Sequence, residues 1–216
     1  LNGQTKNKRQ LALDAIHIEQ NMIKENVGSQ DQSTAAFGSL NKIEFGGTQE
    51  IAVYPIVMKP ERLKELQSHL MLFFTDFPRN ASDVAKEQIK LTPKKQTELS
   101  LIRQTVDEGI DILQNDNREM NEFGKLLNNA WQVKRTLTSK ITNPKLDAIY
   151  TTGIKAGATG GKLLGAGGGG FMLFFVRPEL QKKVKEKLKK FLHVPFHFEH
   201  TGSQIIYLGH TEDNHY

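Results

Sequence analysis

Two acidic side chains are the residues of this sequence best suited to catalysis or metal binding. Glu19 falls within an apolar-periodic segment, and Asp31 follows it, after Gly28, in a stretch of small residues. A carboxylate held on a helix can bind a metal ion, and a carboxylate in a glycine-flanked turn can accept a proton. Most exposed acids only solvate a surface, so these two positions alone leave both interpretations open.

A glycine-rich run over residues 160–170 is the second candidate, since seven of its eleven residues are glycines. Glycine adds no side-chain packing and loses much entropy on folding, so the run indicates that bare backbone is needed beside a ligand or another segment. Successive free N–H groups in such a turn can bind a phosphate, and Lys162 would add a positive charge. The alternatives are a tight turn before a buried strand and a flexible linker, although Leu163, Leu164 and Phe171 are untypical of a polar linker.

The spacing within this run excludes two common nucleotide-binding motifs. The run contains no Gly-Lys-Ser or Gly-Lys-Thr ending, so it is not a P-loop of the Walker type. Residues 165–170 fit the pattern Gly-x-Gly-x-x-Gly, but the apolar residues 171–176 predict a strand directly after them. The dinucleotide-binding fingerprint needs a helix at that point.

The first sixty residues are predicted to form a helix, a turn region and a hairpin. Apolar residues at spacings of three and four predict an amphipathic helix over 8–24, whose apolar side is formed by Leu11, Ala15, Ile18, Met22 and Ile23. Small residues predict a tight turn region over 31–38. Two alternating runs, 40–45 and 50–57, flank Gly46-Gly47 and predict a β-hairpin.

Beyond Pro60 the pattern predicts a compact α+β domain. The predicted elements are, in order, a helix over 61–67, a strand over 69–75, helices over 81–90, 94–114, 117–134 and 144–156, a strand over 171–176, a helix over 178–192, and strands over 194–200 and 204–209. This order is typical of helices packed on one face of a single sheet. We place a domain boundary between Met58 and Ser68.

Composition narrows the class of protein. The chain has 216 residues, of which 38% are hydrophobic and 25% charged, and its longest apolar run, 171–176, is far too short to span a membrane. The absence of cysteine excludes disulfides, thiolate catalysis and cysteine metal sites, and it suits a reducing compartment. We therefore expect a cytoplasmic protein without a membrane partner.

The net charge of +5 raises the question of nucleic-acid binding. Much of this charge lies in the lysine-rich residues 182–190, where Val184, Leu188 and Leu192 recur at helical spacing. That pattern predicts a solvated helix face, and no recognised nucleic-acid module accompanies it. We expect no nucleic-acid partner, and the sequence leaves the oligomeric state open.

Residues 162–170, Lys-Leu-Leu-Gly-Ala-Gly-Gly-Gly-Gly, resemble the C-terminal glycine motif of the GHMP kinase superfamily. The superfamily is named after galactokinase, homoserine kinase, mevalonate kinase and phosphomevalonate kinase. Within it, residues 27–32 and 131–135 resemble the heptose-phosphate kinases. The resemblance covers nearly the whole chain. It implies a two-domain α+β architecture, with part of the N-terminal domain in residues 1–60 and a complete ferredoxin-like C-terminal domain in residues 61–216.

The resemblance implies roles for individual residues. Asp31 matches the position usually assigned as general base, and Glu19 matches a glutamate that helps to hold Mg²⁺. The glycine motif lies beside ATP and substrate in the family, which implies backbone contacts from Gly165, Ala166, Gly167, Gly168 and Gly169. Close packing of the two domains is the alternative reason for these glycines.

Five further positions are candidates for binding the sugar phosphate. They are Gly28, Arg79, Lys134, Arg135 and Lys162. Arg79 follows a predicted strand and opens a predicted helix, where a guanidinium could bind a phosphate with two hydrogen bonds. For the charged members of this group, a surface salt bridge is the alternative explanation.

The resemblance implies ATP- and Mg²⁺-dependent phosphorylation of a sugar phosphate. The expected acceptor is the anomeric hydroxyl of D-glycero-D-manno-heptose 7-phosphate, which gives the 1,7-bisphosphate. A fucose kinase domain, or a non-catalytic sugar-phosphate-binding protein of the same fold, are the alternatives. The family's central phosphate loop, Pro-x-x-x-Gly-Leu-Gly-Ser-Ser, does not occur in the sequence. We therefore expect an N-terminally truncated chain with little or no kinase activity of its own.

Overall fold

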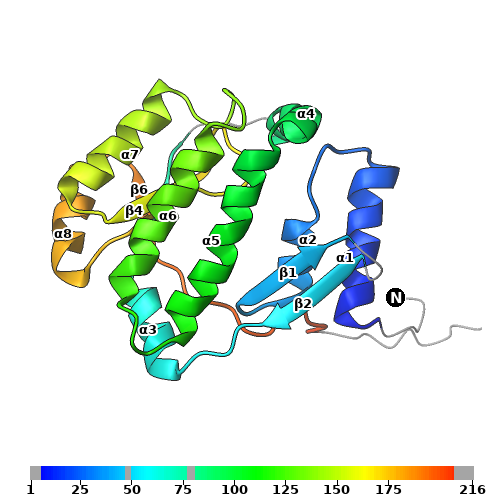
Figure 1. The fold of residues 1–216 in the computed structure, drawn as a ribbon, viewed down its shortest axis with the longest axis horizontal. Helices are drawn as coiled ribbons and strands as arrows, with labels where there is room; N and C mark the ends of the chain where they lie inside the picture. Colours follow the sequence, from blue (N-terminus) through cyan, green and yellow to red (C-terminus); the bar gives the residue numbers. More distant parts are fainter. Residues whose placement is uncertain (1–5, 47–49, 77–80, 207–216) are drawn as a thin grey trace, which may run out of the picture.

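The computed structural model describes residues 6–46, 50–76 and 81–206. Its N-terminal elements are α1 (Lys8–His17), a π-helix (Ile18–Met22), α2 (Gln30–Phe37), and the strands β1 (Asn41–Phe45) and β2 (Ile51–Pro55). The two strands pair antiparallel, with Ile43 opposite Val53. In Figure 1 these elements form the right-hand part of the molecule.

A four-stranded antiparallel sheet organises the remaining residues. Its strands are β3 (Leu70–Phe74), β4 (Gly160–Leu163), β5 (Phe171–Phe175) and β6 (Leu192–Val194), in the spatial order β4-β5-β3-β6. Helices connect β3 to β4 and β5 to β6, whereas a loop connects β4 to β5. This is the connectivity of the ferredoxin-like fold, so the predicted α+β fold class is confirmed.

Six helices accompany this sheet in the described residues. They are α3 (Pro60–His69), α4 (Ala81–Leu91), α5 (Gln96–Gln114), α6 (Met120–Arg135), α7 (Pro144–Ala156) and α8 (Pro178–Lys187). Figure 1 shows α5 and α6 running side by side, with α7 and α8 on the left. The largest hydrophobic core includes Phe73, Met172 and Phe174 from the sheet, together with Ile149 of α7 and Val184 of α8. Alternation along each strand turns these apolar residues toward the helices.

Two glycines allow close packing at the β4 edge. A Cβ atom on Gly160 would lie 1.9 Å from the carbonyl oxygen of Gly124 in α6, and one on Gly153 of α7 would lie 2.3 Å from Phe174. Side chains at these positions would force the helices away from the sheet. The predicted glycine-rich loop therefore begins as a strand, because Gly160–Leu163 pairs with β5.

Most of the predicted elements are confirmed, and four predictions are wrong. Residues 31–38 are not a turn region, because Gln30–Phe37 forms α2. The basic helix ends at Lys187 rather than at residue 192. The strand predicted over 194–200 is wrong except for Val194, because β6 covers Leu192–Val194, and residues 204–206 are not in a strand. Residues 207–209 and the hairpin turn 47–49 lie outside the described residues.

The fourth error concerns the buried side of the first helix. The apolar residues Leu11, Ile18, Met22 and Ile23 are exposed in the structure, whereas Ala12 is fully buried. Ala12 packs with Ala36 and Ile51 in a small core formed by α1, α2 and the hairpin. The helical period was recognised correctly, but periodicity alone does not say which apolar residues a neighbouring element will cover.

The chain after β6 returns to the N-terminal elements, as the red segment in Figure 1 shows. Gln67 holds it by donating to the carbonyl of Phe196 and accepting from the amide of Phe198. Further along, the amide of Ser39 donates to the Glu199 carbonyl, and the amide of Ser203 donates to the Ala35 carbonyl. This segment therefore links the two parts of the molecule.

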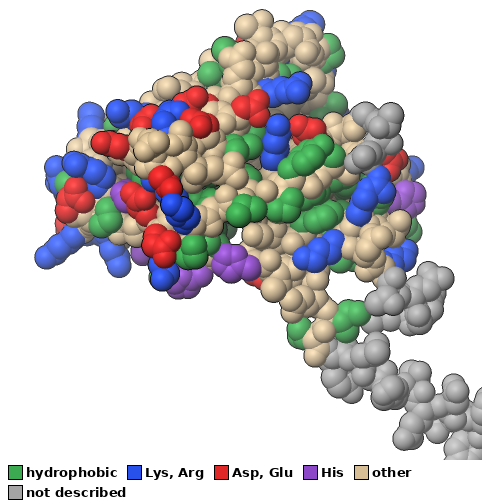
Figure 2. Space-filling model, turned by 60° about the horizontal axis from the view of Figure 1, so that its bottom comes forward, with side chains coloured by type: hydrophobic (Ala, Val, Ile, Leu, Met, Phe, Trp, Pro, Cys, Tyr) green, Lys and Arg blue, Asp and Glu red, His purple; other side chains and the backbone are tan. Residues whose placement is uncertain are grey.

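The predicted division of side chains in the basic segment is confirmed for Val184 and Leu188, which are buried, and for Lys182, Lys185 and Lys189, which are exposed. Leu192, the third predicted apolar position, is exposed and lies in β6. Figure 2 shows Lys and Arg side chains crowded at the left-hand end, where α8 lies, and hydrophobic side chains nearer the middle of this face. Among the helices of the described residues, none is both long enough and apolar enough to cross a membrane.

Candidate functional site

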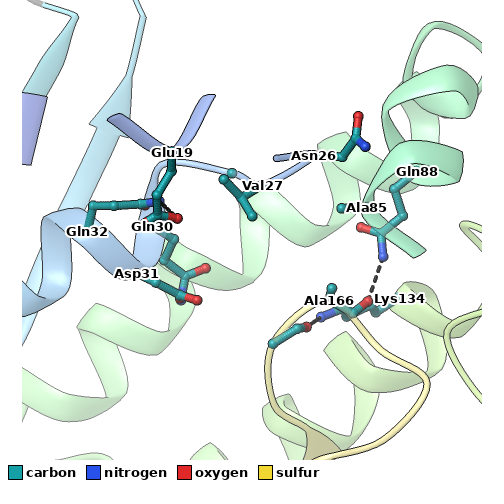
Figure 3. A pocket seen from close by; sticks show the side chains of 12 residues that line it. Glu19, Asn26, Val27, Gln30, Asp31, Gln32, Ala85, Gln88, Lys134 and Ala166 are labelled. Atoms are coloured by element: carbon teal, nitrogen blue, oxygen red, sulfur yellow. Dashed lines mark hydrogen bonds between the residues drawn. The ribbon is translucent and has the colours of Figure 1, made fainter. Parts of the chain in front are cut away.

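A pocket of about 260 Å³ lies between the N-terminal elements and the domain that contains the sheet. One wall comes from the π-helix, the loop after it and α2, and the other comes from α4, α6 and the glycine-rich loop. Its lining residues are Glu19, Asn26, Val27, Gly28, Gln30, Asp31, Gln32, Ala85, Gln88, Lys134, Gly165 and Ala166. Figure 3 shows the two acids on one side and Ala166, Gln88 and Lys134 on the other.

Glu19 reaches the pocket from the π-helix that continues α1. Such widened turns occur mostly as short insertions within helices, frequently at functional sites. The amide Nε2 of Gln32 donates to Oε2 of Glu19 at 2.8 Å, which fixes the orientation of the carboxylate. The neighbouring Gln20 donates to the carbonyl of Val27 at 3.0 Å and holds the loop that forms this wall.

Asp31 occupies the first turn of α2 and is exposed to solvent. The amino end of a helix favours a negative charge, because its first N–H groups have no partner within the helix. The helix also holds Asp31 more rigidly than the predicted turn would. Asp31 and Glu19, which are twelve positions apart in the sequence, therefore line the same pocket.

The loop between β4 and β5 needs glycine for its backbone conformation. Gly165, Gly167, Gly168 and Gly170 all have positive φ, from 75° to 128°. A Cβ on Gly167 would also lie 2.8 Å from Cα of Ile141, and the amide of Gly168 donates to the carbonyl of Ile141. The loop is thus packed against the turn before α7. These glycines are thus explained by backbone conformation and by packing within the domain that contains the sheet.

Side chains from two helices hold the carbonyl groups of this loop. Lys134 Nζ of α6 donates to the carbonyl oxygen of Gly165 at 2.6 Å. Gln88 Nε2 of α4 donates to the carbonyl oxygen of Ala166, also at 2.6 Å (Figure 3). The peptide planes at this edge of the pocket are therefore held from two directions.

The structure brings together six of the predicted site residues. Glu19, Asp31, Gly28, Lys134, Gly165 and Ala166 line the pocket. Gly28 is exposed, and a Cβ atom there would meet no atom within 4 Å, so packing does not explain this glycine.

The other predicted residues lie elsewhere or were not described. Gly167, Gly168 and Gly169 belong to the glycine loop but do not line the pocket. Arg135 pairs with Asp147 of α7 at 2.8 Å. Lys162 lies on β4 opposite Leu173, where burial lowers the pKa of its ammonium group. Arg79 lies outside the described residues.

Six residues that line the pocket were not among the predicted site residues. They are Asn26, Val27, Gln30, Gln32, Ala85 and Gln88. Their side chains are uncharged and give no charge pattern, although Val27, Gln30 and Gln32 lie within the residues 27–32 that resemble the heptose-phosphate kinases. The spacing of Ser82, Ala85 and Gln88 on a predicted helix could have indicated a shared face. Nothing in the sequence showed that this face would meet the glycine loop.

The pocket suits Mg²⁺ better than a metal held by many protein ligands. Within the described residues, no group of three or more His, Asp or Glu side chains could hold a metal ion. Mg²⁺ commonly binds through one or two carboxylates, with water and substrate phosphates as its other ligands. Glu19 and Asp31 are carboxylates on one wall of a pocket, so the residues present fit such an ion when phosphate is bound with it.

Residues 111–194 match the protein family described as GHMP kinases C terminal. With the ferredoxin-like topology and the glycine loop, this match identifies a GHMP kinase C-terminal domain within the chain.

Particular relatives resemble the chain beyond this domain. It is 32% identical over 165 residues to the D-glycero-alpha-D-manno-heptose 7-phosphate kinase of Campylobacter jejuni, an alignment that covers 76% of this chain and 48% of that protein. It is 26% identical over 150 residues to the bifunctional fucokinase/GDP-fucose pyrophosphorylase of Arabidopsis thaliana, covering 67% of this chain and 14% of that protein.

A solved structure supports the same relationship. The crystal structure of a D-glycero-D-manno-heptose 1-phosphate kinase from Bacteroides thetaiotaomicron matches with a TM-score of 0.60 and 26% identity. The match covers 93% of this chain and 56% of that one. The chain therefore spans about half the length of the heptose kinases that it resembles.

Proposed function

We propose that this chain forms part of an ATP-dependent kinase that phosphorylates a sugar phosphate, and that the pocket is one side of its active site. The observation that supports this most strongly is the convergence of Glu19, Asp31 and the glycine loop on one pocket, in a chain with a GHMP kinase C-terminal domain that is similar to sugar kinases. Phosphoryl transfer needs positioning and charge neutralisation more than covalent chemistry. A pocket with two carboxylates that can hold Mg²⁺, opposite a glycine loop with backbone N–H groups, offers both.

Asp31 is proposed to orient the acceptor hydroxyl of the sugar and to take its proton as the new phosphate ester forms. An exposed carboxylate at the amino end of a helix is accessible to such a hydroxyl and held in a defined place. Glu19, held by Gln32, is proposed to bind Mg²⁺, which would neutralise charge on the transferring phosphate. The glycine loop is proposed to contribute backbone N–H groups on the opposite side of the pocket.

Heptose 7-phosphate is the proposed acceptor, with phosphorylation of the anomeric hydroxyl. The support is the identity to the Campylobacter jejuni heptose 7-phosphate kinase. The structural relative from Bacteroides thetaiotaomicron is named for a heptose 1-phosphate, so the two names differ in the position of the phosphate. The similarity to a fucokinase keeps fucose as the second candidate.

Product identification tests this proposal. The full-length protein is incubated with ATP, Mg²⁺ and, separately, heptose 7-phosphate, heptose 1-phosphate or fucose, and the products are identified by phosphorus NMR. We expect a new anomeric phosphate signal with heptose 7-phosphate. A product from fucose alone would favour the fucose kinase alternative, and binding of heptose 7-phosphate without turnover would favour a non-catalytic sensor.

The 216 residues alone are proposed to be inactive or nearly so, because the family's central phosphate loop does not occur in their sequence. The same assay on the isolated chain tests this, and robust ATP-dependent turnover would contradict it. Cytoplasmic localisation remains a prediction from the absence of cysteine.

A further inference from the structure

Helix α4 belongs to one wall of the pocket and contacts a loop of each wall. At its start, the backbone N–H and the side-chain amide of Asn26 both donate to Oγ of Ser82, at 3.3 Å and 3.0 Å. Near its end, Gln88 donates to the carbonyl of Ala166 in the glycine loop. Ala85 lies between the two contacts and lines the pocket, as Figure 3 shows.

These contacts arise from one face of one helix. Ser82, Ala85 and Gln88 are spaced by three residues, so they lie on the same side of α4. A helix rises 1.5 Å per residue, so the six steps from Ser82 to Gln88 span about 9 Å along its axis. The loop that contains Asn26 and the glycine loop thus contact α4 at two points that are about 9 Å apart along the helix axis.

Helix α4 has anchors besides its contacts with the two loops. Glu87 accepts a hydrogen bond from Thr138 and pairs with Lys140 at 3.0 Å, which attaches α4 to the turn after α6. Val84 is buried in the main core, next to Gly168 of the glycine loop. These anchors hold α4 where Gln88 and Ser82 can contact the two loops.

The hydrogen bond from Gln88 also fixes the direction of a peptide group. In a trans peptide the carbonyl and the following N–H point in opposite directions. By holding the carbonyl of Ala166, Gln88 therefore sets the direction of the N–H of Gly167. In the same way, Lys134 holds the carbonyl of Gly165 and sets the direction of the N–H of Ala166. Gly165 and Gly167 have positive φ, and glycine is the least restricted residue, so these two hydrogen bonds limit the rotation of the peptide planes between them.

We infer that Gln88 is a positioning residue, which holds the glycine loop in one conformation through the carbonyl of Ala166. Together with Ser82 it makes α4 the element that sets the separation of the two pocket walls. Its effect on catalysis rests on the proposed function, because it requires that the loop lie beside the transferring phosphate. The anchoring itself does not depend on that function.

The anchoring is tested by hydrogen exchange of the backbone amides, measured by mass spectrometry on the full-length protein without ligands. Gln88→Met keeps the length of the side chain and removes the donor. Gln104→Met is the matched control, because Gln104 is an exposed glutamine of α5. Loss of one hydrogen bond should speed exchange in residues 164–170 by about five- to tenfold and leave α7 unchanged. Exchange equal to that of the control would overturn the inference.

Steady-state kinetics test the catalytic part with the same two variants. A misplaced catalytic loop should lower kcat by about tenfold or more while the sugar KM stays within about threefold. Faster exchange with unchanged kcat would show that the anchor has no role in positioning for catalysis. Absence of turnover in the unaltered protein would contradict the proposed function, and the exchange result would still decide the anchoring. If Gln88→Met does not fold, Gln88→Glu provides the same test, because a carboxylate cannot donate to the carbonyl.

Discussion

Glu19 and Asp31 reach the same pocket from two different kinds of helix. Glu19 lies in a π-helix and is oriented by Gln32, whereas Asp31 lies in the first turn of α2. Gln32 is buried, and its Oε1 has no hydrogen-bond partner in the described residues. A buried amide oxygen without a hydrogen-bond partner lowers the stability of the fold. We therefore assign Gln32 to the support of Glu19 rather than to the stability of the fold.

Gln32→Met should separate these two roles. The variant removes the donor to Glu19 together with the unpartnered oxygen, so we expect the free energy of unfolding to change by no more than about 1 kcal/mol. The Mg²⁺ concentration needed for half-maximal kinase activity should rise about tenfold, which is typical when a residue that orients a metal ligand is lost. Urea denaturation and a Mg²⁺ titration of the initial rate are the measurements. An unchanged Mg²⁺ dependence would show that Gln32 does not orient a metal ligand.

Only part of the site could be predicted at this scale. Glu19, Asp31 and the glycine motif were found because charge and glycine leave a pattern in the sequence. Gln32 and Gln88 carry neither, and their contacts depend on residues 13 and 78 positions away. Such contacts are properties of the folded chain, so a single sequence does not reveal them.

At the scale of elements, helices α5 to α7 were predicted from the helical spacing of their apolar residues, and strands β3 and β5 from continuous apolar runs. Strand β4 was missed, because Gly160 and Gly161 have no strand propensity. Glycine is needed at these two positions because α6 and Phe174 lie too close for any side chain. Helix α2 was missed because a run of small residues with serine and threonine is also typical of a turn. Burial of Ala36 in a core shared with α1 and β2 stabilises the helix.

Two mid-helix glycines provide a matched test of this close packing. In Gly153→Ala the new methyl group would lie 2.3 Å from Phe174, so we expect a loss of about 1–3 kcal/mol in the free energy of unfolding. In Gly109→Ala the nearest atom lies at an ordinary 3.5 Å, and the higher helix propensity of alanine should give a gain of up to about 1 kcal/mol. Urea denaturation of both variants measures the difference. Equal effects would contradict the packing that we describe for α7.

At the scale of the whole molecule, the segment after β6 joins the N-terminal elements to the domain that contains the sheet. Glu199 organises the turn in this segment: its carboxylate accepts hydrogen bonds from the hydroxyl and amide of Thr201 and from the amide of Gly202. Gly202 in turn packs against Gly38: a Cβ atom on Gly38 would lie 2.2 Å from the backbone nitrogen of Gly202. Residues far apart in the sequence are thereby held together.

The turn at Glu199 should make this connection sensitive to acid. The hydroxyl and amide donors of Thr201, with the amide of Gly202, lower the pKa of Glu199 from 4.5 to about 2. Because the folded-state pKa is the lower one, the stabilisation is fully present above pH 4.5 and is lost as the pH falls toward 2.

Thermal denaturation of the unaltered protein and Glu199→Gln between pH 2 and pH 7 tests this dependence. We expect the variant to melt at a lower temperature near neutral pH and the difference to shrink toward pH 2. Glu61→Gln, at the exposed start of α3, is the control. A difference that does not depend on pH would contradict the assigned role of the Glu199 carboxylate.

Asp31→Asn in the full-length protein tests most directly whether the phosphoryl group is transferred in this pocket. The amide keeps the size of the side chain and cannot accept the proton. We predict that turnover with heptose 7-phosphate falls by at least about 100-fold, while calorimetry shows the affinity for the sugar phosphate within about threefold of the unaltered protein. A variant that keeps its turnover would show that phosphoryl transfer does not depend on this pocket.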